Sequence, residues 1–335
     1  MLHACIIFGV LIIAKMDFNF KTIQEFNDYF KDELTCYQFF ENVRWNGVPV
    51  CPHCGNEKYY EVAARGKFKD IPSYRCADRK CGLPFTVRTK SIFEGSKVEF
   101  RKWLQAAYEI TTCKNGISSI ELATRIGVSQ KTGWFINHRL RAMLVETEPT
   151  LLRDFAALDE AGVGGKEKNK HADKRIPGAQ GRSGKGKTTV FGARGLRGQV
   201  KTQVVPNAEA VTLKPIVERW VEKGAIMVTD EWTSYNSLKK DYFHITVNHS
   251  AGEYVNGCFS TNGIENFWSL FKRGISGTHH AVSPQHLQRY CDEFTDRYNK
   301  KDISNIQRFE KAVERCGNTR LTYRELTAGI NPINE

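Results

Sequence analysis

Four cysteines between residues 51 and 81 constrain the fold of this chain more than any other feature. Cys51 and Cys54 stand in a Cys-Pro-His-Cys-Gly run, and Cys76 and Cys81 follow after two short segments of strand-like composition. Four thiolates complete a closed tetrahedral zinc site, and a unit this small cannot build a core without the metal. The sequence therefore predicts a zinc ribbon over residues 49–90 with one structural Zn²⁺. Reduced, metal-free cysteines are the alternative.

Three acidic residues occupy positions where predicted elements end or begin. Asp159 and Asp230 each end an apolar run typical of a buried strand, and Glu265 opens an amphipathic helical pattern. Carboxylates of this kind suit Mg²⁺ or Mn²⁺ rather than softer metals. Two such ions roughly 4 Å apart can activate a nucleophile and stabilise the leaving oxygen of a phosphodiester. The alternative is that these acids are solvated or cap helices.

The sequence around these acids contains several distinctive runs. They are LDE at 158–160, VGGKEKNKH at 163–171, VTDE at 228–231, VNHS at 247–250, EYV at 253–255 and TNGIENFWSLFKRG at 261–274. These runs resemble motifs of the DDE transposases of bacterial insertion sequences, and above all of the group with an amino-terminal zinc ribbon, the ISXO2-like transposases. The resemblance runs from about residue 17 to 310.

The resemblance implies a ribonuclease-H-like domain over residues 150–300 that cuts and joins DNA. Asp159, Asp230 and Glu265 would hold two Mg²⁺ ions, and thirty-four residues separate the second acid from the third, as is common among DDE enzymes. Lys272 follows two helical turns after Glu265 on nearly the same face, where its charge would hold a phosphate. The partners implied are the terminal inverted repeats, target DNA and further copies of the chain.

Two positions depart from the family pattern. Relatives commonly carry Thr-Tyr where this chain has Ala161-Gly162, and Gly-Thr where it has Lys90-Ser91. Because some members use Asn as the third ligand, Asn262 is a second candidate for that position. A non-catalytic DNA-binding regulator and a Mg²⁺ nuclease without strand transfer are the competing functions.

Residues 97–145 predict a helix-turn-helix that contacts DNA. Ser118 and Ser129 are suited to cap two helices, and Gly127 allows the turn between them. Apolar residues predicted to pack inward lie at positions 120, 122, 123 and 126 of the first helix. The second helix would enter the major groove, and a purely structural trihelical unit is the alternative. Residues expected to face DNA are Gln130, Lys131, Thr132, Asn137 and Arg139.

The distribution of charge favours a polyanionic partner. The chain has 49 basic and 37 acidic residues, a net charge of +12. Residues 86–145 and 164–188 each carry a surplus of +6, and the second stretch has the composition of a mobile basic loop. Double-stranded DNA is the natural partner for such patches. Further expected DNA contacts are Lys166, Lys168, Lys170 and Arg273.

The predicted organisation is α+β and multidomain. After a misassigned or disordered leader (1–16) and a small helical segment (17–48) come the zinc ribbon and the helix-turn-helix. The acid-bearing domain then follows the order strand, strand, strand, helix, strand, helix, strand, helix, which matches a mixed sheet flanked by helices. Residues 301–335 are expected to form a C-terminal tail, which the mixture of charges indicates is peripheral beyond residue 310.

Several classes of protein are not favoured by the sequence. The apolar run at residues 4–14 is too short to span a bilayer, and Met16 is the expected start. No Walker-type loop is present, so we expect no nucleotide cofactor.

Six further cysteines are scattered singly, as in a reduced cytoplasmic protein. They are Cys5, Cys36, Cys113, Cys258, Cys291 and Cys316.

Overall fold

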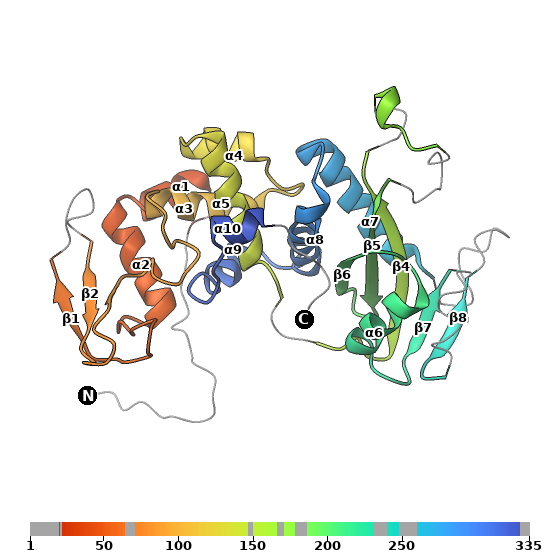
Figure 1. Ribbon diagram of the computed structural model, residues 1–335, viewed down its shortest axis with the longest axis horizontal. Coiled ribbons are helices and arrows are strands. Elements are labelled where there is room, and N and C mark those ends of the chain that lie inside the picture. The colour runs from red at the N-terminus through yellow and green to blue at the C-terminus, as the bar shows by residue number, and fades with distance from the viewer. Residues whose placement is uncertain are drawn as a thin grey trace. The chain divides into compact units, whose positions relative to one another are not determined.

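The chain divides into two compact units. One contains residues 1–108 and 305–320, and the other contains residues 109–304 and 321–335. The division falls within helix α3 (Phe100–Thr112) rather than at the expected boundary near residue 97. The computed structural model (Figure 1) describes residues 20, 22–63, 71–146, 150–165, 171–177, 186–230, 240–247 and 260–328, so the expected leader lies outside the described residues.

The first unit has an aromatic core that joins both ends of the chain. Helix α1 (Ile23–Tyr29) and helix α2 (Glu33–Trp45) carry buried rings, among them Phe26, which packs against Tyr108 with ring centroids 4.9 Å apart. Helix α9 (Asn305–Val313) adds Phe309, whose ring lies 5.9 Å from Phe26. Because Val313 of the same helix is also buried, this part of the chain beyond residue 310 is not the peripheral tail that we expected.

The four cysteines lie beside a small antiparallel sheet, as predicted. Its strands are β1 (Tyr59–Val62), β2 (Ser73–Cys76) and β3 (Pro84–Phe85), in that order. One face buries Tyr74 and Phe85 against Trp45 of α2, with the Tyr74 and Phe85 rings 5.5 Å apart. This is a very small apolar core, and a metal held by the four cysteines would add to the stability of the ribbon.

The second unit is built on a five-stranded mixed sheet in the order β6-β5-β4-β7-β8. The first three strands are antiparallel, and β7 and β8 run parallel to β4. This topology is consistent with the ribonuclease-H-like domain that we expected. The expected helix between the last two strands would fall at 231–239, outside the described residues. The strands are β4 (Phe155–Val163), β5 (Thr188–Gly195), β6 (Val200–Val205), β7 (Ile226–Thr229) and β8 (Phe243–Thr246).

Helices cover both faces of this sheet (Figure 1). Alternate residues of β4 point to opposite faces. Leu158 packs in a cluster with α6 (Ala210–Trp220), whereas Ala157 packs in a cluster with α7 (Asn262–Gly274) and α8 (Pro284–Asn299). The second cluster contains large rings from α7, including Trp268, so α7 is held firmly against the sheet.

The predicted helix-turn-helix forms in the second unit as α4 (Ser119–Ile126) and α5 (Gln130–Met143). Ser118 and Ser129 cap the two helices, and Gly127 takes the left-handed conformation between them (φ 63°). The expectation for Ile120 was wrong: its side chain is 68% exposed rather than packed inward. Among the described residues, no helix is long and apolar enough to cross a membrane.

Candidate active site

Asp159 and Asp230 become neighbours through strand pairing. Asp159 lies within β4 and not at its end, because β4 continues in pairing with β5 as far as Val163. The parallel partner β7 pairs Val228 with Ala157. Two residues further along this register, Asp159 stands opposite Asp230, which directly follows β7. Since adjacent strands lie about 4.8 Å apart, the fold places these two acids next to each other.

Two glycines allow α7 to approach the sheet closely. A Cβ atom on Gly192 of β5 would lie 2.4 Å from Cζ2 of Trp268, so the buried indole occupies the space of the missing side chain. A Cβ atom on Gly263 would lie 2.5 Å from Nη1 of Arg194. The first turn of α7 therefore rests on β5, and this turn carries Glu265.

Glu265 is oriented by a residue that the sequence analysis did not single out. Thr261 is buried at the beginning of α7, and its hydroxyl donates a hydrogen bond of 2.8 Å to Oε1 of Glu265. Thr261 and Glu265 stand four residues apart in the TNGIEN run. Because residues i and i+4 lie next to each other on a helix, this spacing could have predicted the contact. Asn262, the second candidate for this position, is exposed at the first helical residue.

Electrostatics link all four candidate catalytic residues. Burial raises the pKa of Asp159 from 3.8 to about 7, and the charges of Asp230 and Glu265 raise that pKa as well. A hydrogen bond from the Glu160 amide and the charge of Lys272 act in the opposite direction. A carboxyl group with this pKa is poorly stabilised as an anion by the protein alone.

This donor set fits hard divalent cations. Asp159 is partly buried, the charges of Asp230 and Glu265 act on it, and a cation would offset the repulsion that raises its pKa. Within the part of the chain that the structure describes, no choice of one oxygen from each of the three carboxylates brings all three within 4.8 Å of one another. A site for two ions does not require this, because each ion takes only some of the acids.

The cysteine site is more compact. Within the described ranges, the sulfur atoms of Cys51, Cys54, Cys76 and Cys81 all lie within 4.8 Å of one another. A hydrogen bond from the Gly55 amide to the carbonyl of Cys51 (2.8 Å) closes the first knuckle. Four sulfur donors at this separation match the structural type of zinc site, in which the protein fills every coordination position.

The predicted DNA-facing residues divide into three groups: exposed, outside the described residues, and buried. Gln130 and Lys131 are exposed at the start of α5, Thr132 is partly exposed beside them, and Arg273 is exposed at the end of α7. Lys166, Lys168 and Lys170 lie outside the described residues.

Two of the predicted DNA contacts were wrong. Asn137 is fully buried, and its amide donates to the carbonyl of Ile117 at 3.2 Å. Arg139 is also buried, and its Nε donates to the carbonyl of Leu321 at 2.8 Å. Both side chains hold neighbouring segments together, because this part of α5 packs inside the second unit and does not face solvent.

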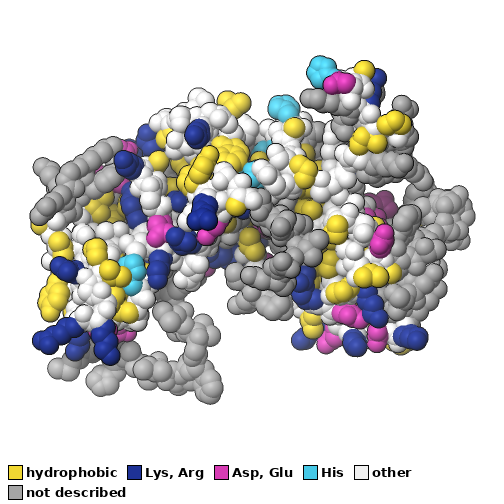
Figure 2. Space-filling model, in the orientation of Figure 1, with side chains coloured by type: hydrophobic (Ala, Val, Ile, Leu, Met, Phe, Trp, Pro, Cys, Tyr) yellow, Lys and Arg dark blue, Asp and Glu magenta, His cyan; other side chains and the backbone are white. Residues whose placement is uncertain are grey.

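The basic surplus of residues 86–145 is also partly internal. Arg141 is 1% exposed, and Arg88 directs its guanidinium to the carbonyls of Ser96 and Val98. On the face seen in Figure 2, Lys and Arg side chains of the described residues lie among apolar and acidic ones. The net charge of residues 86–145 is therefore not all at the surface, since Arg139 and Arg141 are buried.

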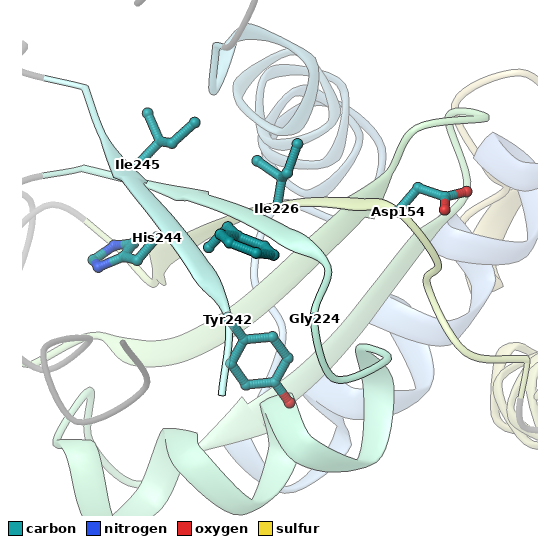
Figure 3. A pocket seen from close by; sticks show the side chains of 7 residues that line it. Asp154, Gly224, Ile226, Tyr242, His244 and Ile245 are labelled. Carbon is teal, nitrogen blue, oxygen red and sulfur yellow. The ribbon is translucent and has the colours of Figure 1, made fainter. Parts of the chain in front are cut away.

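A pocket of about 880 Å³ lies away from these acids (Figure 3). It opens at the start of β7 and along β8, whereas Asp230 follows the end of β7. Ile226 and Ile245 point to one side of the sheet and Tyr242 to the other. The remaining lining residues are Asp154, Gly224, Phe243 and His244, so the pocket contains none of the candidate catalytic residues.

A four-cysteine ribbon and a mixed sheet that sets Asp159 opposite Asp230 are the features of a zinc-ribbon protein with a DDE-type domain. Comparison with known families agrees: residues 151–299 match the ISXO2-like transposase domain, and residues 31–83 match a transposase zinc-ribbon domain. The chain belongs to the ISXO2-like transposase family.

Two relatives illustrate this membership. A protein in transposable element ISH50 of Halobacterium salinarum is 29% identical over 79% of this chain and 90% of its own length. A transposase-like protein of Haemophilus influenzae is 32% identical over 33% of this chain and 89% of its own length. No solved structure matches the chain.

Proposed function

We propose that this chain is a DNA transposase that binds the terminal inverted repeats of an insertion sequence and catalyses strand cleavage and strand transfer. The observation that supports the proposal is the strand register that sets Asp159 opposite Asp230, together with the raised pKa of Asp159, about 7, to which burial and the charges of Asp230 and Glu265 contribute. The match to a family of DDE transposases indicates the class of reaction. The acids alone would fit any phosphodiester chemistry that depends on divalent cations.

Asp159, Asp230 and Glu265 are the residues that would hold two Mg²⁺ or Mn²⁺ ions. When bound, such ions activate a nucleophilic oxygen and stabilise the leaving oxygen of a phosphodiester. Thr261 keeps the Glu265 carboxylate in one orientation through its 2.8 Å hydrogen bond. Lys272 is exposed on the same helix, and its ammonium group would hold a phosphate beside the acids.

The proposed reaction has two steps at one site. In the first, a water oxygen attacks a phosphorus atom at the end of the element, the bond to the 3′-oxygen breaks, and a 3′-hydroxyl is released. In the second, that hydroxyl attacks a phosphorus atom of target DNA and displaces another 3′-oxygen. The carboxylates are not nucleophiles, so no covalent intermediate forms with the protein.

DNA recognition is assigned to the amino-terminal elements. Gln130, Lys131 and Thr132 lie at the start of α5, where a recognition helix contacts base edges. Arg273 and the zinc ribbon would contact DNA elsewhere, together with Lys166, Lys168 and Lys170. Because two element ends are joined in one event, we propose that at least two copies assemble on DNA.

The test is a strand-transfer assay with the full chain, zinc, Mg²⁺ and a duplex that carries the repeats flanking its reading frame. The wild-type protein should give joined products, and Asp230→Ala should give neither cleaved nor joined products while its affinity for the duplex stays within about twofold. Cleavage without joining would identify a nuclease instead, and binding without cleavage by the wild type would identify a regulator.

A matched acid provides the control. Asp241 precedes β8 in the same unit and pairs with Lys223 at 3.5 Å on the surface. Asp241→Asn should cleave and join DNA at the wild-type rate. Equal losses in Asp230→Ala and Asp241→Asn would show that acids of this unit act through general charge, and the assignment of Asp230 as a metal ligand would then be wrong.

A further inference from the structure

A fully buried acid on α8 joins three segments of the second unit. Glu293 has no exposed surface, and both of its carboxylate oxygens accept hydrogen bonds from arginines. Arg141 of α5 donates through Nε to Oε2 at 2.6 Å, and Arg297 of α8 donates through Nη2 to Oε1 at 2.7 Å. We refer to these three side chains as the buried bridge.

The bridge also holds the segment that precedes the helix-turn-helix. Arg297 donates to the carbonyl of Ile110 at 2.9 Å and to that of Cys113 at 3.0 Å, at the carboxyl end of α3. The chain then passes Gly116, where an added Cβ would lie 2.8 Å from Oε1 of Glu293. Only glycine fits there, because its φ of +78° is also unfavourable for other residues.

The same bridge reaches the continuation of α7. That helix ends in a π-helical turn (Ile275–His279), and the added Cβ of Gly116 would lie 3.1 Å from Nε2 of His279. The imidazole of His279 packs on Tyr290 with centroids 4.8 Å apart, and the guanidinium of Arg141 lies 3.9 Å from the centre of the same phenol ring. Helix α5 and the end of α7 therefore meet on one side chain of α8.

The charged groups of the buried bridge favour one arrangement of α5 against α8. A buried ion pair is often no more stabilising than apolar side chains of similar volume, since the charges lose their hydration. Its bonds, however, have fixed lengths and directions, so α5 cannot slide along α8 without leaving a charge unpaired. Apolar packing alone tolerates such shifts more readily.

We propose that Glu293, with Arg141 and Arg297, is a positioning residue that sets the distance between the DNA-recognition helix α5 and the catalytic helix α7. The inference rests on the proposed function. DNA held at Gln130–Thr132 is thereby delivered to the acids near Glu265 in one register. Loss of the bridge leaves recognition intact, because the exposed start of α5 is unchanged, but the scissile phosphate is misplaced.

The test compares binding with cleavage in Glu293→Gln, using the full chain with zinc and Mg²⁺. Two duplexes are used, one with the element ends and one with the same bases scrambled. The variant should bind the end duplex within about twofold of wild type and prefer it over the scrambled duplex. Its cleavage of the end duplex should fall on the order of 100-fold, as misplacement by about 1 Å does to a reacting group.

Asp296→Asn is the matched control. Asp296 lies one turn from Glu293 on α8 and pairs with Lys300 on the same helix, so its loss removes an ion pair that does not reach α5. This variant should cleave at the wild-type rate. If Glu293→Gln does not fold, as judged by its circular dichroism, Arg141→Lys replaces it, since lysine keeps the charge but not the directed Nε bond.

The outcomes separate the two proposals. Wild-type cleavage by a folded bridge variant, or equal losses of binding and cleavage, would overturn the positioning role. Cleavage lost with binding retained in Glu293→Gln, but not in Asp296→Asn, would support it. A wild-type protein that neither binds nor cleaves the end duplex would instead refute the proposed function, and the bridge would then have no recognition helix to position.

Discussion

The two candidate metal sites of this protein are built in opposite ways. The four cysteines lie within thirty-one residues of sequence, and their sulfur atoms already lie within 4.8 Å of one another. The three acids come from β4, from the residue directly after β7 and from the start of α7, and the pKa of the first of them, Asp159, is raised to about 7. Four protein donors would close the first site around an ion, as in structural sites, whereas the second keeps a carboxyl group that the protein alone stabilises poorly as an anion, a property that is common in catalytic sites.

The largest effect should follow removal of zinc. Binding of Zn²⁺ to four thiolates contributes about 10 kcal/mol or more to the folding of small zinc domains. The ribbon has only a few buried rings besides the site. Cys76→Ser should therefore lose zinc, measured by elemental analysis, and residues 49–90 should become sensitive to protease.

Cys113→Ser tests whether this effect belongs to the cluster. Cys113 lies outside the ribbon, and its thiol contacts Glu109 at 3.6 Å. The variant should retain stoichiometric zinc. If Cys76→Ser also kept its zinc and its resistance to protease, the assignment of the four cysteines as a closed structural zinc site would be wrong.

The next effect concerns the open site and its dependence on pH. The folded protein without divalent ions keeps a proton on Asp159 up to about pH 7, whereas the unfolded chain loses it near 3.8. Raising the pH through this interval therefore lowers the free energy of unfolding, by at most about 4 kcal/mol. Asp159→Asn should show a smaller decrease from pH 4 to pH 8 than wild type, measured by denaturant unfolding.

Magnesium should reverse this decrease only where the acid is present. At pH 8, a saturating concentration should stabilise the wild type more than Asp159→Asn, because cation binding favours the ionised carboxylate. Equal stabilisation of both proteins would mean that Asp159 is not a ligand, and would remove the contrast with the cysteine site.

A smaller effect should follow a change that moves the catalytic helix without touching an acid. In Gly192→Ala the new methyl group would collide with Trp268, since the Cβ position lies 2.4 Å from Cζ2. Overpacking of this kind destabilises by about 1–3 kcal/mol. Because α7 carries Glu265, cleavage of the end duplex should fall at least about tenfold, with duplex affinity nearly unchanged.

Gly277→Ala is the control for an added methyl group, since no atom lies within 4 Å of its Cβ position. It should leave both stability and cleavage close to wild type. A Gly192→Ala protein with full activity would show that the open site tolerates displacement of α7.

The same contrast explains what the sequence could predict. The ribbon and the helix-turn-helix depend on nearby residues: cysteine spacing fixes the first, and the caps Ser118, Gly127 and Ser129 fix the second. The strand runs before Asp159 and Asp230 were recognisable because buried strands are continuously apolar.

What could not be predicted depends on contacts between distant segments. Arg139 is buried because the carbonyl of Leu321, 182 residues later, accepts its hydrogen bond. Phe309 joins the core of the first unit although its segment has the charge mixture of a tail. Asp159 lies inside a strand and not at its end because β5 pairs with β4 beyond it. No local pattern contains this information.

The smallest predicted effect distinguishes exposed from buried cations on one helix. Lys131 is exposed at the start of α5, whereas Arg139 is buried on the same helix. Lys131→Ala should weaken binding of the end duplex a few fold and reduce the slope of log affinity against log salt by about 1, as loss of one phosphate contact does. Arg139→Ala should lower the melting temperature and leave that slope unchanged in the folded protein. The reverse pattern would mean that α5 turns its other face to DNA, and the exposed start of this helix would then not be the recognition surface.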